Sequence, residues 1–167
     1  MTSWGFSVLG NPAPQGSKRF VGLSNAGHAK LVESSKAVAP WREAVVAQAP
    51  SHPRLDGPIA VKMVFTLPRP STARKRDLHP YRTPDLSKLA RSTEDAITTA
   101  GLWADDARVS EYVRLAKVWP GFDDDSLHVP GCVVAAVEIA WDWQELLEDV
   151  FRRAIDVRRQ KREGTLT

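Results

Sequence analysis

Residues 85–101 read DLSKLARSTEDAITTAG, and this stretch predicts the best-defined helix of the chain. Its apolar side chains recur every three or four residues, as they do on the face of a helix that packs against a core. They are Leu86, Leu89, Ala90, Ala96, Ile97 and Ala100. Gly101 follows where a helix C-cap is favoured. The pattern predicts a helix over about 86–100, and its polar face is expected to carry Ser87, Lys88, Arg91, Glu94 and Asp95.

Strands are predicted on both sides of this helix. The clearest alternation comes after Gly57-Pro58, at Ile59, Val61, Met63, Phe65 and Leu67. Further strands are expected over 4–9, 109–118 and 133–141, and further helices over about 40–49 and 143–160. The order β-α-β-α-β-β-α predicts one α/β (α+β) domain over 1–167, with a mixed sheet of about four strands flanked by helices. Trp4, Trp41 and Trp141 are predicted to lie in its core, and Trp103 is expected to pack the turn after the helix, with base stacking as the alternative.

The composition limits the kinds of binding partner, metal site and cellular location that the sequence allows. Lys and Arg outnumber Asp and Glu by 23 to 20, a formal charge of +3, so the distribution of charge matters more than its sum. The single cysteine, Cys132, lies in an apolar run and is expected to be a buried thiol. No Cys/His spacing fits zinc. No signal segment or bilayer-length apolar run is found, so we expect a soluble, cytoplasmic protein, in the host cytoplasm if phage-encoded. Asp123-Asp124-Asp125 is expected to be a polar turn.

Two segments concentrate positive charge. The proline-punctuated stretch 68–83 predicts a long, mobile basic loop, and loops of that length are often functional. Its cations are predicted to contact phosphates, with a solvated linker as the alternative: Arg69, Arg74, Lys75, Arg76 and Arg82. Lys18 and Arg19, in a Pro/Gly-rich N-terminal loop, receive the same interpretation. The basic C-terminal helix at about 143–162 is either a further DNA contact or a solvated end suited to the helix dipole.

Acidic residues flank the predicted helix. Asp85 stands at its start, and Asp105 and Asp106 lie in the turn after it. Phosphodiester cleavage needs a hard cation, and Mg²⁺ prefers carboxylate oxygens while it retains several waters. Lys88 or Arg91 could then hold the phosphate. The alternatives are a helix cap at Asp85, an ordinary polar turn and a solvated face with ion pairs. Periodicity alone leaves these alternatives open.

The patterns Pro-Asp-Leu-x-Lys-Leu-x-Arg-Ser-x-x-Asp-Ala-Ile (84–97) and Ala-Gly-x-Trp-x-Asp-Asp-Ala-x-Val (100–109) resemble the RusA family of Holliday junction resolvases, particularly its phage-borne members. The segments 10–19, 32–36 and 40–42 resemble phage members too, so the likeness spans roughly 6–118. It implies a RusA-like fold and a Mg²⁺-dependent endonuclease, with Mn²⁺ as a substitute, that resolves branched DNA by paired symmetric nicks in recombination or repair. It also implies a homodimer with no small-molecule cofactor.

The resemblance assigns residues by position. The family's first catalytic aspartate falls on Asp85, its acidic pair on Asp105 and Asp106, and its catalytic lysine on Arg91. Asp106 is the stronger metal ligand of the pair, and Asp95 matches a supporting aspartate. Ser87 departs from the pattern, because the family carries a second aspartate there. Glu94 is the candidate compensation for metal binding. For the function of the whole protein, two alternatives to a nuclease remain: a branched-DNA-binding protein that has lost cleavage, and an adaptor without a nucleic-acid role.

Overall fold

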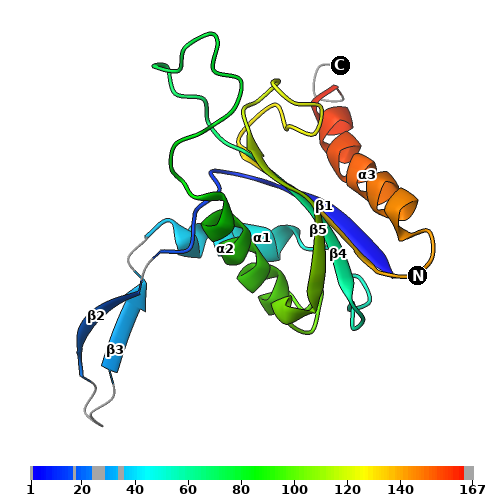
Figure 1. Ribbon diagram of the computed structural model, residues 1–167, viewed down its shortest axis with the longest axis horizontal. Helices are drawn as coiled ribbons and strands as arrows, with labels where there is room; N and C mark the ends of the chain where they lie inside the picture. Colours follow the sequence, from blue (N-terminus) through cyan, green and yellow to red (C-terminus); the bar gives the residue numbers. More distant parts are fainter. Residues whose placement is uncertain (1, 17, 24–28, 34–35, 164–167) are drawn as a thin grey trace.

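The computed structural model describes residues 2–16, 18–23, 29–33 and 36–163, and side chains within 2–16 and 36–156. The strands are β1 (Ser3–Leu9), β2 (Lys18–Leu23), β3 (Ala29–Glu33), β4 (Ile59–Thr66), β5 (Val109–Val118) and β6 (Gly131–Glu138). The helices are α1 (Val38–Gln48), α2 (Leu86–Thr99) and α3 (Trp143–Glu163), with a short 3-10 turn, η1 (Asp106–Arg108). Figure 1 shows their arrangement as a single compact α+β fold.

The main sheet has four strands in the order β1-β6-β4-β5. β6 pairs antiparallel with both β1 and β4, whereas β4 pairs parallel with β5. Parallel neighbours need a crossover connection, and α2 lies within the one that joins β4 to β5. The mixed four-stranded sheet predicted from the sequence is therefore confirmed. This topology also places the start of α2 at one end of the sheet and η1 at the other (Figure 1).

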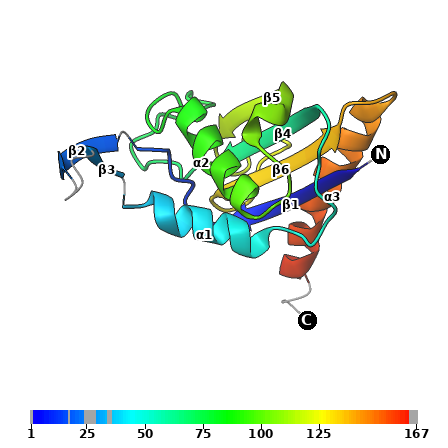
Figure 2. The same cartoon turned by 90° about the horizontal axis from the view of Figure 1, so that it is seen from below.

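Both faces of the sheet are covered. Every residue of β4 is buried, because its alternating side chains enter two different clusters. Ile59, Met63 and Phe65 pack in the larger cluster with residues of α1 and α2. Ala60 and Val64 pack in the second cluster with α3. Figure 2 shows α1 and α2 on one side of the sheet and α3 on the other. Of the described helices, none has the length and apolar character needed to cross a membrane.

The tryptophan predictions are partly confirmed. Trp4, Trp41 and Trp103 are at most 3% exposed. Trp103 packs the turn, since its ring lies 5.6 Å from that of Trp4 and its Nε1 donates to Thr98 Oγ1 at 2.7 Å. Trp141 is 93% exposed, so its placement in the core was wrong. The alternation that suggested a buried strand continues past Glu138, but β6 ends there and the chain turns into α3.

The hairpin formed by β2 and β3 was not predicted. The two strands form a separate antiparallel sheet with an irregularity between Phe20 and Gly22, and in Figure 1 it extends away from the main sheet. Glycine weakens strand patterns, so the segment reads from sequence as a loop. The predicted phosphate contacts Lys18 and Arg19 begin β2, and their side chains lie outside the described part of the chain.

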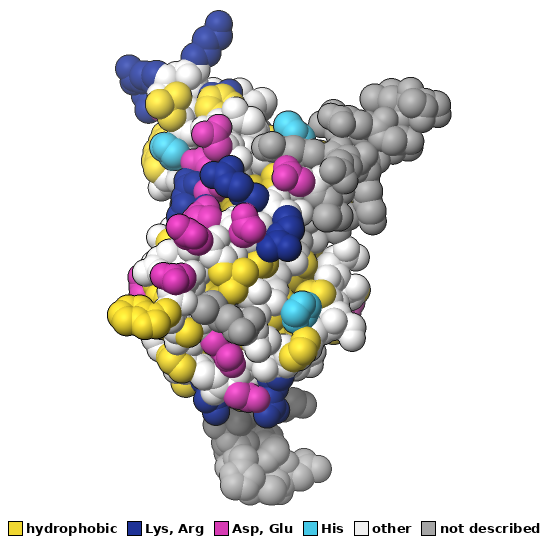
Figure 3. Space-filling model, turned by 90° about the vertical axis from the view of Figure 1, so that its right-hand side faces the viewer, with side chains coloured by type: hydrophobic (Ala, Val, Ile, Leu, Met, Phe, Trp, Pro, Cys, Tyr) yellow, Lys and Arg dark blue, Asp and Glu magenta, His cyan; other side chains and the backbone are white. Residues whose placement is uncertain are grey.

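The connection between β5 and β6 is fastened by ion pairs. Arg114 on β5 binds Asp123 at 2.6 Å and also pairs with Asp125. Lys62 on β4, only 5% exposed, binds Asp125 at 3.2 Å and Glu148 of α3 at 2.7 Å. The Asp123-Asp124-Asp125 turn is thus held by a network of ion pairs that joins β4, β5 and α3. Figure 3, which faces the side that carries α3 in Figure 1, shows basic and acidic side chains intermixed.

Candidate functional site

Asp85 occupies the N-cap position of α2, yet its side chain makes no capping hydrogen bond. Its carboxylate lies 3.5 Å from Lys88 Nζ, and both side chains are about half exposed, at 57% and 49%. Ser87 is also exposed. The prediction that the Asp85 side chain caps the helix is therefore wrong, although the residue stands at the N-cap position. Its carboxylate is exposed and can be reached by a ligand from solvent.

Asp105 and Asp106 have different roles at the far end of the helix. Asp105 caps η1, because its Oδ1 accepts a hydrogen bond from the backbone N–H of Ala107 at 2.8 Å. Asp106 is exposed in the first turn of η1, and no hydrogen bond or ion pair holds its carboxylate within the described residues. Of the two, Asp106 has the carboxylate that is available to a cation, as the sequence suggested.

Glu94 differs most from expectation. It is 8% exposed rather than part of a solvated face, and its Oε1 accepts a hydrogen bond from the Tyr112 hydroxyl of β5. The pKa of Glu94 is raised to about 7, mainly by burial and also by the nearby carboxylates of Asp106 and Asp95, against the opposing effect of Arg91. Glu94, Asp106 and Arg91 thus lie within electrostatic reach of one another.

Asp95 supports the helix. It pairs with Arg42 of α1 at 2.5 Å, and Arg42 also donates to the Gln15 side chain. The segment before β2 is fixed to α2 by two further bonds, from Gln15 N to the Lys88 carbonyl at 2.8 Å and from Ser92 Oγ to the Ala13 carbonyl at 2.5 Å. The supporting role expected for Asp95 is therefore a tie between α1, α2 and the N-terminal loop.

The predicted acids are divided between the two ends of α2. The helix has 14 residues, which span about 21 Å at ~1.5 Å per residue. Asp85 precedes its first turn, whereas Asp106 lies beyond its last turn and interacts with Glu94. Among the described residues, no three His, Cys, Asp or Glu side chains are close enough together to hold a metal ion. The structure brings Asp106 and Glu94 together and leaves Asp85 apart.

The basic loop is held partly by its own arginines. The Arg69 guanidinium lies 4.5 Å from the Phe122 ring centroid and 4.9 Å from that of Trp119, and it donates to the Arg74 carbonyl at 2.9 Å. Arg74 pairs with Asp77 at 3.3 Å. Lys75, Arg76 and Arg82 are exposed, so they are the loop cations best placed to contact a phosphate.

Three side chains that organise this region were missed by the sequence analysis. Tyr112 bonds Glu94, Arg42 bonds Asp95, and Lys117 Nζ of β5 donates to the carbonyls of Arg82 at 2.6 Å and Pro84 at 2.9 Å. Only the burial of Glu94 had a signal in the sequence. Glu94 lies four residues after Ala90 and three before Ile97, on the apolar stripe.

Comparison with known proteins adds the family. The chain matches the family model described as Endodeoxyribonuclease RusA over residues 10–121, about two-thirds of its length. No curated protein matches the sequence. The matched region begins just after β1 and includes α1, β4, the basic loop, α2, η1 and β5, and so it contains Asp85, Glu94, Asp95, Asp105 and Asp106. The chain therefore belongs to the RusA family of endodeoxyribonucleases.

Proposed function

We propose that this protein is a Mg²⁺-dependent endonuclease that resolves four-way DNA junctions by paired symmetric nicks. The observation that carries the proposal is the contact between α2 and η1. There Glu94, buried beneath Tyr112, lies close enough to Asp106 for the two carboxylates to repel each other, and no ion pair holds either carboxylate in the described part of the chain. In a member of a nuclease family, uncompensated carboxylates beside an exposed arginine suit a metal and a phosphate.

The donor set fits a hard cation in its chemistry. Asp106 and Glu94 would supply carboxylate oxygens, and DNA phosphate oxygens and water would supply the rest, since Mg²⁺ needs only one or two protein carboxylates. Asp105 is committed to its cap and would assist from the adjacent position. When bound, the ion neutralises charge on the phosphate and lowers the pKa of a bound water.

The remaining residues hold and orient the substrate. Arg91 is exposed about one turn before Glu94, where its guanidinium can donate two parallel hydrogen bonds to a phosphate. At the other end of the helix, Lys88 is about half exposed and lies 3.5 Å from Asp85, so its ammonium can position a phosphate beside that carboxylate. Family members carry a second aspartate at the position of Ser87. In this chain Glu94 supplies the replacement carboxylate, and it does so nearer to Asp106 than Ser87 lies.

A homodimer belongs to the proposal for two reasons. A four-way junction has two-fold symmetry, so paired nicks need two related sites, and a C₂ dimer supplies them. Moreover, α2 separates Asp85 from Asp106 by about 21 Å of helix within one protomer. A second copy can bring its own Asp85 beside Asp106 and complete a site that one protomer leaves divided.

The first experiment is nicking of a labelled four-way junction in Mg²⁺, Mn²⁺ or EDTA. Asp106→Asn should lower the nicking rate on the order of a hundredfold or more and preserve junction binding, because the ion supplies several kcal/mol of charge stabilisation. The matched control is Asp124→Asn, an exposed acid in the other acidic segment, and it should nick like the wild type. Tight binding with no nick in either metal would establish the binding-only alternative instead.

Mixing of two inactive variants tests how the sites are shared. If each site uses Asp85 from one protomer and Asp106 of the partner subunit, a mixed dimer of Asp85→Asn with Asp106→Asn contains one intact site. Nicking of one strand should then return when the two variants are unfolded and refolded together. Sites built within single protomers would stay inactive in the same mixture.

A further inference from the structure

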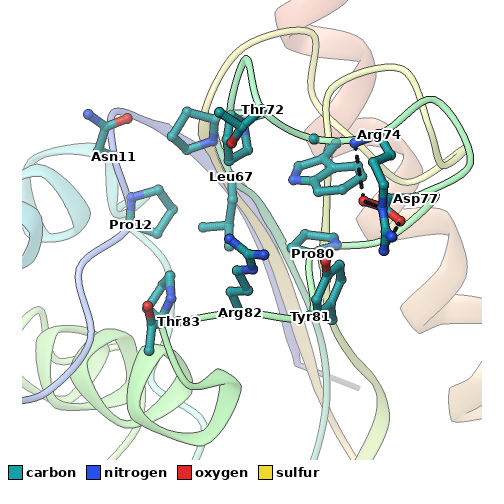
Figure 4. Close-up of a pocket in the computed structure, with 15 residues that line it drawn as sticks. Asn11, Pro12, Leu67, Thr72, Arg74, Asp77, Pro80, Tyr81, Arg82 and Thr83 are labelled. Atoms are coloured by element: carbon teal, nitrogen blue, oxygen red, sulfur yellow. Dashed lines mark hydrogen bonds and ion pairs between the residues drawn. The ribbon is translucent and has the colours of Figure 1, made fainter.

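A cavity lies beneath the basic loop, next to the start of α2. It has a volume of about 570 Å³ and lies between Asn11-Pro12, the segment 67–84 and the end of β5. Its lining is mixed: Leu67 and the rings of Pro12, Pro70, Pro80, Tyr81 and Trp119 form the apolar part, and Asn11, Thr72 and Thr83 add uncharged polar groups (Figure 4). A volume of this size suits one small organic ligand, since such sites measure roughly 300–1,000 Å³.

Of the charged side chains that line this cavity, one is available to a ligand. Asp77 is already paired with Arg74, which donates to it from both its backbone and its side chain. Arg82 has no carboxylate partner among the described residues, and its guanidinium lies 5.6 Å from the Tyr81 ring. Figure 4 shows the Arg82 side chain directed into the space between Thr83 and Tyr81, toward Leu67. The cavity therefore combines flat apolar walls with one unpaired guanidinium donor.

The cavity is fixed in position relative to α2. Pro84 lines it and directly precedes Asp85. The Lys117 side chain holds the carbonyls on both sides of Thr83, at 2.6 and 2.9 Å, so β5 anchors this segment. A DNA strand whose phosphate is held at Lys88 would therefore lie next to the cavity.

We propose that this cavity receives an unpaired nucleobase of the bound DNA strand, next to the phosphate held at the start of α2. The inference rests on the proposed junction-cleaving function and adds to it a base-reading pocket. A phosphate alone would gain little from the apolar walls, whereas a base has two flat faces and edge acceptors for Arg82. Bases that flank a branch point cost less to take out of the helix than bases within a duplex, because the continuous stacking of the duplex is already interrupted there.

The test uses four-way junctions in which one nucleotide at a time, within the first few pairs of the branch point, is replaced by an abasic site. Binding is measured in Ca²⁺ without Mg²⁺, so that it is read independently of cleavage. Wild-type protein should bind one or two positions of the scan about tenfold more weakly than the intact junction, in line with the loss of one stacked base. The other positions should bind normally.

Two cavity variants and one control variant outside the cavity test whether that effect comes from the cavity. Thr72→Trp fills the cavity from an exposed loop position, and it should make intact and abasic junctions bind alike. Leu78→Trp adds the same side chain to the same loop outside the cavity, at a residue 59% exposed, and should keep the position-specific loss. Arg82→Met provides a second cavity variant, and it should reduce the loss without filling the space.

The outcomes separate the pocket from the function. A uniform scan with normal junction binding and nicking would overturn the pocket and leave the nuclease proposal intact. A position-specific loss of binding that persists in both Thr72→Trp and Arg82→Met would also overturn the pocket. A position-specific loss without nicking in Mg²⁺ would support the pocket and reject cleavage. No preference for junctions over duplex would overturn both proposals.

Discussion

Two groups of carboxylates beside β5 differ in how their charge is matched. In the matched group, Asp123 and Asp125 are bound by Arg114 and Lys62, and hydrogen bonding from Arg114 lowers the pKa of Asp123. In the unmatched group, Glu94 and Asp106 face each other, and burial together with that repulsion raises the pKa of Glu94 to about 7. Acids of the first kind stabilise the fold, whereas acids of the second kind cost stability until a cation arrives.

The largest effect is expected from removing the cation of the matched group. Arg114→Met leaves Asp123 and Asp125 without their main partner at side-chain exposures of 14% and 11%. We expect a loss of roughly 2–3 kcal/mol in the free energy of unfolding at pH 7, at the low end for a broken buried pair because Arg114 itself is a third exposed. Urea unfolding measures it.

Arg153→Met is the control for this change. Arg153 pairs with Asp149 at 3.5 Å on the surface, where both side chains are about 70% exposed, and its loss should be under about 0.5 kcal/mol. Asp123 has a lowered pKa, so its contribution is present above its unfolded pKa near 3.8 and is lost as pH falls further. Equal losses of unfolding free energy in Arg114→Met and Arg153→Met would contradict the expected difference between the buried and the surface pair. So would a loss in Arg114→Met that does not change as the pH falls below about 3.8.

Glu94→Gln should have the opposite sign. The folded pKa of about 7 exceeds the unfolded value of 4.5, so the wild type loses stability as pH rises between these values. The amide keeps an acceptor for Tyr112 and removes the charge. We expect Glu94→Gln to raise the free energy of unfolding by roughly 1–2 kcal/mol at pH 8, after allowance for solvent screening, and to change it little at pH 5. Glu111→Gln, at an exposed position of β5, should be neutral at both pH values.

Metal addition sharpens the same comparison. At pH 8, 10 mM Mg²⁺ should stabilise the wild type by about 1.4 kcal/mol if the dissociation constant is on the order of 1 mM. Thermal unfolding should record this as a rise of a few degrees in Tm. The gain should disappear in Asp106→Asn and persist in Asp124→Asn. A gain of the same size in both variants would place the ion elsewhere.

The smallest effect is expected at Tyr112. Tyr112→Phe removes the hydroxyl that donates to Glu94 and leaves the ring in place. We expect a loss of about 0.5–1 kcal/mol at pH 8, where Glu94 is ionised. The loss should be absent in a Glu94→Ala background, and a double-mutant cycle by urea unfolding measures that coupling. A loss unchanged by that background would mean that the ring alone stabilises the strand.

Much of the architecture could be predicted from local patterns. The bounds of α2 and β4 follow from their apolar periodicity, because each packs a defined face on the core. The hairpin of β2 and β3 could not be predicted, since its glycines interrupt the alternation and it pairs outside the main sheet. Trp141 shows the limit of extending a pattern: the alternation continues past Glu138, but the turn to α3 does not follow it.

The residue types of the site could be predicted, but its contacts between distant segments could not. Family resemblance placed Asp85, Arg91 and Asp106 on the correct helix and turn. The separation of Asp85 from Asp106 follows from the length of the predicted helix between them. The contact of Tyr112 with Glu94 could not be predicted, because it depends on how β5 packs against α2. Contacts between distant segments, such as Lys117 with the residues before α2, leave no local pattern.

The basic loop is fastened at both ends to β5. Leu67 N donates to the Val118 carbonyl at 2.8 Å where the loop begins, and Lys117 holds the Arg82 and Pro84 carbonyls where it ends. Lengthening a flexible loop between fixed ends is inexpensive, at about 0.6 kcal/mol for each doubling. The segment 68–83 should therefore tolerate insertions or exchanges of sequence while α2, β5 and their acids keep their places.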